Sequence, residues 1–136
     1  MILVDAGPLV ALIHRGDRHH EICQRALQSL DEPMVTVWPA FTKAMYLLGF
    51  SWQAQDALWQ FVARKVLSFL PLERADFPRM RALMEQYQDL PMDLADAALV
   101  RAAEREGIRR IFTLDRRDFQ IYRPEGLESF RLIPEP

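Results

Sequence analysis

Residues 2–8 read Ile-Leu-Val-Asp-Ala-Gly-Pro, and this stretch sets the pattern for the rest of the chain. A short apolar run that contains β-branched residues predicts a buried strand at 2–4. Asp5 ends that strand, and Pro8 suits the first turn of a helix, where the N–H that proline lacks has no partner in any case. The sequence therefore predicts a strand that opens directly into a helix, with Asp5 at the junction.

The same order of strand and helix recurs along the chain. Short apolar runs predict further strands at 34–37, 66–70, 111–114 and 130–133. Apolar residues at helical spacing predict helices at 18–30, 39–48, 75–87 and 92–106, and Ser51 is placed to cap one more. Strands that alternate with helices favour a mostly parallel sheet with helices on both faces. We therefore expect an α/β fold of three layers with four or five strands, in a single domain at 1–136.

Composition narrows the class of protein. The net charge of −2 excludes the global basic field that by itself announces a nucleic-acid binder, so any RNA contact must be local. The single cysteine, Cys23, cannot form an internal disulfide and favours a reducing compartment. The apolar run at 1–4 is too short for a signal peptide, and no stretch has the length of a membrane span. We expect a cytoplasmic protein with no membrane partner.

Acidic residues follow the elements that should end at one edge of the sheet. Asp5 and Asp115 each come after the last apolar residue of a predicted strand, and the carboxyl ends of parallel strands are where sites form. Asp93 and Asp96 lie three apart at the start of a predicted helix, hence on one face. Asp118 follows Asp115 by one turn. The topology thus predicts that these carboxylates gather.

A cluster of carboxylates indicates metal binding more strongly than a single aspartate does. Any single aspartate at such a position is most simply a helix cap. Several together repel one another unless a cation neutralises them. Hard cations that prefer oxygen ligands, Mg²⁺ or Mn²⁺, meet that need. The pattern predicts a divalent metal site.

Four motifs occur in order along nearly the whole chain. They are Ile2-Leu3-Val4-Asp5 with 8–12, Thr36-Val37-Trp38-Pro39 leading to Ala44, Asp96-Ala97-Ala98-Leu99-Val100 with Ala103, and Thr113-Leu114-Asp115 with 116–119. In this order the sequence resembles the PIN-domain family, and within it the VapC-type toxins of toxin-antitoxin pairs. The resemblance implies a flavodoxin-like sheet and metal-dependent endonucleolytic cleavage of RNA.

The resemblance also assigns roles to residues. Asp5, Asp96 and Asp115 match the catalytic acids that hold Mg²⁺ or Mn²⁺ in the family, and Asp93 and Asp118 are auxiliary acids. VapC-type proteins generally form homodimers and bury a segment of a cognate antitoxin in a groove. In this chain that groove would lie near Trp38, Tyr46 and Trp59, whose helical spacing predicts either core packing or a partner surface.

Lys43 departs from the family pattern. The family usually has a glutamate at this position in the helix after the second strand, and no nearby acid replaces it. One interpretation makes Lys43 a solvated helix residue; the other inserts it between Asp5 and Asp96 in the place of the cation. In the second case the ribonuclease would be weakened or inactive, and the alternative function is a non-catalytic PIN-fold module that binds RNA or protein.

Other candidates carry weaker signals. Arg15, Arg18, Arg116 and Arg117 are predicted to flank the carboxyl edge, where Arg15, Arg116 and Arg117 are the candidates for binding RNA phosphates. Three histidines near the first helix have no cysteine or distant histidine to complete a transition-metal site, so we expect surface histidines.

A receiver domain of the response-regulator type also clusters aspartates on such a sheet, but the paired acids after the first strand that it needs are absent.

Overall fold

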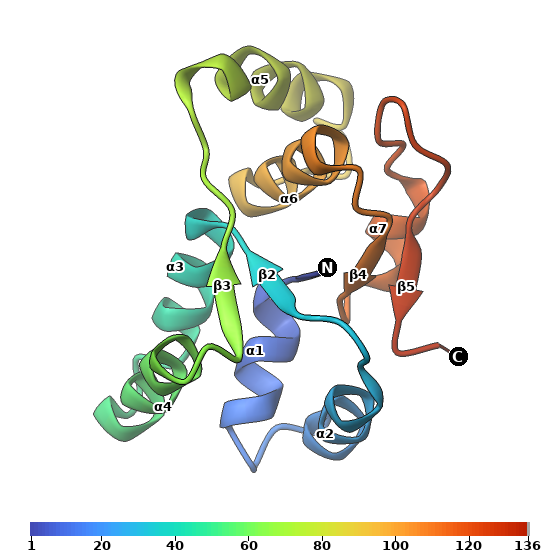
Figure 1. The fold of residues 1–136 in the computed structure, drawn as a ribbon. Helices are drawn as coiled ribbons and strands as arrows, with labels where there is room; N and C mark the ends of the chain where they lie inside the picture. The colour runs from blue at the N-terminus through green and yellow to red at the C-terminus, as the bar shows by residue number, and fades with distance from the viewer. Residues whose placement is uncertain (136) are drawn as a thin grey trace.

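The computed structural model describes residues 1–135 as a parallel sheet of five strands in the order β3-β2-β1-β4-β5 (Figure 1). The strands are β1 Ile2–Val4, β2 Met34–Thr36, β3 Leu67–Phe69, β4 Arg110–Phe112 and β5 Arg131–Ile133. This sheet confirms the predicted α/β class; residue 136, included in the predicted domain, lies outside the described range. Because β1 is central and pairs with β4, the residues that follow these two strands lie together at the carboxyl edge.

Seven helices surround the sheet in the described part of the chain. They are α1 Ala6–Ile13, α2 His20–Ser29, α3 Trp38–Leu47, α4 Trp52–Ala63, α5 Phe77–Gln86, α6 Leu94–Glu106 and α7 Arg116–Ile121. The sequence did not predict α7, because six residues are too few to show an apolar period. A 3-10 turn at Arg74–Asp76 precedes α5. Within residues 1–135, no helix is both long enough and apolar enough to cross a membrane.

Side chains of the strands alternate between two helical layers. Leu3 and Ile111 pack into the core beneath α6, whereas Ile2, Val4 and Phe112 pack into the core beneath α1 and α3. Figure 1 shows α5 and α6 on one side of the sheet and α1 and α2 on the opposite side. Since both faces are covered, β1 is fully buried and delivers Asp5 to the edge in one orientation.

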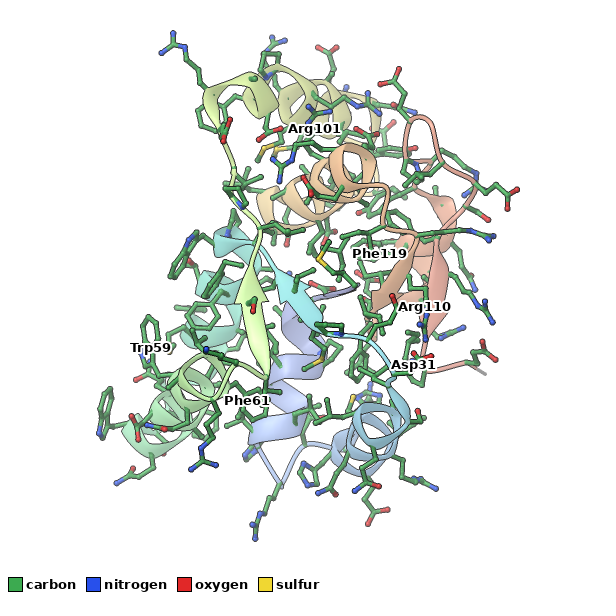
Figure 2. All side chains as sticks on the ribbon, viewed as in Figure 1. Asp31, Trp59, Phe61, Arg101, Arg110 and Phe119 are labelled. Atoms are coloured by element: carbon green, nitrogen blue, oxygen red, sulfur yellow. The ribbon has the colours of Figure 1, made fainter. Side chains whose placement is uncertain are left out.

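The position of α6 matters most for the acidic residues. Its buried face is rich in alanine, which lets the helix approach the sheet closely, and it ends at Gly107, whose positive φ of 69° suits glycine. The buried carboxylate of Asp76, before α5, accepts hydrogen bonds from Arg101 at 2.8 Å and Arg105 at 2.6 Å. Arg101 lies between α6 and α5 in Figure 2. These ion pairs fix α6 against the 3-10 turn that precedes α5.

Candidate active site

Asp5 is held by a single threonine hydroxyl and the start of α1. Its Oδ1 accepts a hydrogen bond from the N–H of Ala6 at 2.7 Å, and Thr113 Oγ1 donates to its Oδ2 at 3.0 Å. Thr113 lies just after β4, and its oxygen also accepts from the N–H of Asp115 at 3.0 Å. One buried hydroxyl therefore links the end of β1 to the start of α7.

Asp96 lies in the first turn of α6, next to a buried tyrosine. The Tyr122 hydroxyl donates to Asp96 Oδ2 at 2.8 Å, and both side chains are buried. Burial and the charge of Asp96 raise the pKa of Tyr122, so the phenol stays a donor at neutral pH. Asp93 caps α6, because its Oδ1 accepts from the N–H of Asp96 at 2.8 Å. Asp93 therefore fits the simplest interpretation of a single aspartate at such a position, that of a helix cap.

Three carboxylates come close enough to share one cation. Asp96, Asp115 and Asp118 each offer an oxygen, and these three oxygens lie within 4.8 Å of one another. Asp115 precedes α7 and Asp118 lies in its first turn. Asp118, predicted as an auxiliary acid, thus belongs to this group; Asp5 is not part of it, but its charge acts on Asp96 and Asp115.

Burial gives these acids unusual proton affinities. Loss of solvent, and then the charge of Asp5, raises the pKa of Asp96 to about 7, although the hydrogen bond from Tyr122 opposes this. Asp115 is exposed by surface area, so its loss of solvent is only partial; this loss and the nearby Asp118 raise the pKa of Asp115 to about 6. Burial also raises the pKa of Asp5. A divalent cation would stabilise the ionised form of such carboxylates strongly, because it offsets their mutual repulsion. A donor set made only of oxygen atoms fits Mg²⁺ or Mn²⁺.

These raised pKa values make the stability of the metal-free protein depend on pH. Between the ordinary pKa of 3.8 and about 7, folded Asp96 keeps a proton that the unfolded chain releases. The free energy of unfolding is therefore expected to fall as pH rises through this interval, by about 1–3 kcal/mol. Thermal unfolding in EDTA from about pH 5 to pH 8 measures the effect. A midpoint that rises over this range would contradict it.

Lys43 pairs with Asp93 and does not insert between Asp5 and Asp96. Its Nζ donates to Asp93 Oδ2 at 2.7 Å, and its side chain is 44% exposed. Partial burial works to lower the pKa of Lys43, but the hydrogen bond and charge of Asp93, together with Asp5 and Asp96, outweigh it and raise this pKa. The lysine is therefore charged and belongs to the site, although it stands at the edge of the acids.

The arginines predicted to bind phosphates are dispersed. Arg15 lies in the turn between α1 and α2, at the far end of α1 from Asp5, so its predicted place at the carboxyl edge is wrong (Figure 1). The cause is that α1 runs back along the sheet, away from that edge. Arg116 donates to the carbonyl oxygen of Pro134 and is engaged within the fold. Arg117 is exposed in the first turn of α7, beside the acids.

The aromatic residues Trp38 and Tyr46 of α3 line a groove, whereas Phe41 of the same helix is buried in the core. Trp38 stacks on Phe69 with ring centres 4.0 Å apart, yet remains 49% exposed, and Tyr46 is 81% exposed. Trp59 lies at the outer face of α4 (Figure 2). A hollow of about 630 Å³ extends from Trp38 and Tyr46 to Lys43 and Asp93, and is lined by Trp38, Pro39, Thr42, Lys43, Tyr46, Asp93, Leu94 and Ala95.

Comparison with known proteins agrees with this geometry. A family model described as PIN domain matches residues 2–124. Ribonuclease VapC26 of Mycobacterium tuberculosis (strain ATCC 25618 / H37Rv) is 27% identical over 135 residues, which cover 98% of this chain and 100% of that protein.

Two solved structures have a similar fold. One is the crystal structure of Mycobacterium tuberculosis VapC20, a Sarcin-Ricin loop cleaving toxin, with a TM-score of 0.77 at 18% identity, covering 85% of this chain and 92% of that one. The other is a toxin-antitoxin complex from Klebsiella pneumoniae, with a TM-score of 0.65 at 18% identity, covering 88% and 90%. At this identity the two structures show the fold alone. Since the family model spans nearly all of the chain, the protein belongs to the PIN-domain family.

Proposed function

We propose that this chain is a metal-dependent endoribonuclease that hydrolyses RNA phosphodiester bonds as the toxin of a toxin-antitoxin pair. The observation that carries the proposal is the convergence of Asp96, Asp115 and Asp118 within 4.8 Å, beside the buried Asp5. Membership of the PIN-domain family and the similarity to Ribonuclease VapC26 support the same activity. RNA as substrate and the free cysteine are consistent with work in the cytoplasm.

The residues of such a site would have different roles. Asp96, Asp115 and Asp118 would hold Mg²⁺ or Mn²⁺, with Asp5 adding charge. When bound, the ion supplies Lewis-acid activation of a water molecule and neutralises charge on the phosphate. Thr113 keeps Asp5 and Asp115 in register, and Tyr122 fixes the orientation of Asp96. Arg117, exposed beside the acids, is placed to contact a neighbouring phosphate.

The test of this function is cleavage of RNA by the purified chain. A structured RNA is incubated with the native protein and with Lys43→Glu, each in Mn²⁺, in Mg²⁺ and in EDTA. We expect discrete cleavage products with either metal and none in EDTA, with faster cleavage by the variant. If both proteins bind RNA and neither cuts it, the chain is the non-catalytic binding module.

We also infer a protein partner on the aromatic groove. The exposed aromatics are grouped on α3 and α4, and contiguous apolar surface of this kind marks interaction sites. An antitoxin segment is proposed to occupy it, with a homodimer forming through the neighbouring helical surface. The fold shared with a toxin-antitoxin complex supports this assignment.

Removing the Tyr46 ring is expected to weaken antitoxin binding by at least about tenfold, because an exposed aromatic that becomes buried at an interface contributes about 2 kcal/mol or more. Tyr46 is 81% exposed, so Tyr46→Ala should leave the Tm nearly unchanged. Titration calorimetry with the co-expressed antitoxin measures the loss. Phe77→Ala, which removes an exposed ring from α5, is the control and should bind normally.

A further inference from the structure

Lys43 is attached to the first turn of α6 through one shared carboxylate. Asp93 uses its Oδ2 to accept from Lys43 Nζ at 2.7 Å and its Oδ1 to accept from the N–H of Asp96 at 2.8 Å. The ammonium is therefore fixed next to the acids by the same residue that caps the helix carrying Asp96. A positive charge from α3 thus has a defined place beside the site.

Lys43 lies on the α3 side of the acidic cluster, where it is hydrogen-bonded to Asp93. It favours the ionised forms of Asp93, Asp5 and Asp96, and so contributes to lowering their pKa values. The main influences on Asp115 are burial, Asp118 and Asp5. The two sides therefore differ: on the α3 side Lys43 is hydrogen-bonded to Asp93, whereas Arg117 on the α7 side is exposed and makes no hydrogen bond to an acid among the described residues.

We infer that Lys43 takes the place of one cation in the acidic cluster, so that the chain holds a single divalent ion at Asp96, Asp115 and Asp118. This inference rests on the proposed function, whose metal site it deepens. A fixed ammonium beside Asp93 repels a divalent ion on that side and weakens binding of the ion on the α7 side. The oxygens of Asp96, Asp115 and Asp118 lie within 4.8 Å of one another and form the remaining position for a divalent ion.

Replacement of Lys43 should change both the number of bound ions and their affinity. Mn²⁺ is titrated into metal-free native protein, Lys43→Gln and Lys43→Glu, with free Mn²⁺ followed by electron paramagnetic resonance. We expect one ion in the native chain, at least about tenfold tighter binding of that ion in Lys43→Gln, and a second ion in Lys43→Glu. Spin coupling between two Mn²⁺ ions would identify the second site.

A matched lysine controls for the general effect of charge. The chain has two lysines, and Lys65 is exposed between α4 and β3, before the amino end of that strand. Lys65→Glu makes the same change in net charge and should leave the Mn²⁺ count and affinity unaltered. Equal stoichiometry and affinity in native protein and both Lys43 variants would overturn the inference, as would an equal effect of Lys65→Glu.

A second measurement keeps the inference testable if Lys43→Glu does not fold. Reductive ¹³C-methylation labels Lys43 and Lys65 in the native chain and keeps both positive charges. On addition of Mn²⁺ we expect the Lys43 signal to broaden at one equivalent and the Lys65 signal to remain sharp. Equal broadening of both signals would overturn the inference. Metal binding without cleavage of RNA would instead count against the proposed function, since this readout needs no substrate.

Discussion

An Asp96→Asn chain is expected to cleave RNA about 10³-fold more slowly than the native chain, while its metal-free form becomes more stable. The amide oxygen can still accept from Tyr122, so the local structure is kept. Loss of the charge removes a metal ligand and also removes the repulsion with Asp5 that burial makes costly. Near pH 7.5 in EDTA the gain in stability is expected to be about 1–2 kcal/mol.

Two measurements on the same variant test this result. Initial cleavage rates in Mn²⁺ give the loss of activity, and thermal unfolding in EDTA gives the stability. Asp89→Asn, at an exposed acid before α6, is the matched control and should change neither quantity. Cleavage by Asp96→Asn within tenfold of the native rate would show that Asp96 is not a ligand. A fall in Tm would show that its carboxylate is not under electrostatic strain.

The second large effect is expected at Thr113. Valine has nearly the same shape but has no hydroxyl, so Thr113→Val leaves Asp5 Oδ2 and the N–H of Asp115 without their shared partner. We expect cleavage to fall about 10- to 100-fold and the free energy of unfolding to fall by about 1–3 kcal/mol. The lost activity follows from the freed movement of Asp115 relative to Asp5.

Thr36 provides a control with a hydroxyl in an equivalent setting. It is also fully buried, and its hydroxyl donates to the carbonyl oxygen of Val4 at 2.8 Å and not to an acid. Thr36→Val should therefore lose stability with a much smaller loss of activity, and Thr113→Ser should recover most of the cleavage rate. Equal losses of activity in the two valine variants would contradict a positioning role for Thr113.

Much of this architecture could be predicted because the strands are short apolar runs that end at an acid or a proline. The sequence motif places Thr113 two residues before Asp115, yet nothing in it shows that the hydroxyl reaches Asp5, 108 residues away. Tyr122 was missed for a similar reason. Its partner Asp96 lies 26 residues earlier, and a tyrosine after an unpredicted short helix has no distinctive pattern.

The position of Lys43 shows a different limit of sequence-based prediction. The change from an acidic to a basic residue at position 43 could be predicted from the motif. Which acid Lys43 contacts, however, depends on how α3 packs against the start of α6. The aromatics of α3 and α4 were ambiguous for a related reason, since helical spacing describes a core and a partner groove equally well. Burial decides between them, and Tyr46 is 81% exposed.

The hydroxyl of Thr113 joins acids that lie far apart in the sequence, and this has a consequence for synthesis. Asp5 is synthesised before Asp115 and Asp118, which follow it by more than 100 residues. A nascent chain that has not reached β4 and α7 has no third or fourth carboxylate and no hydroxyl to align the first. The site is therefore assembled only after residues 113–118 have been synthesised, and a chain that stops before them has neither the three-carboxylate group nor the hydroxyl that aligns Asp5.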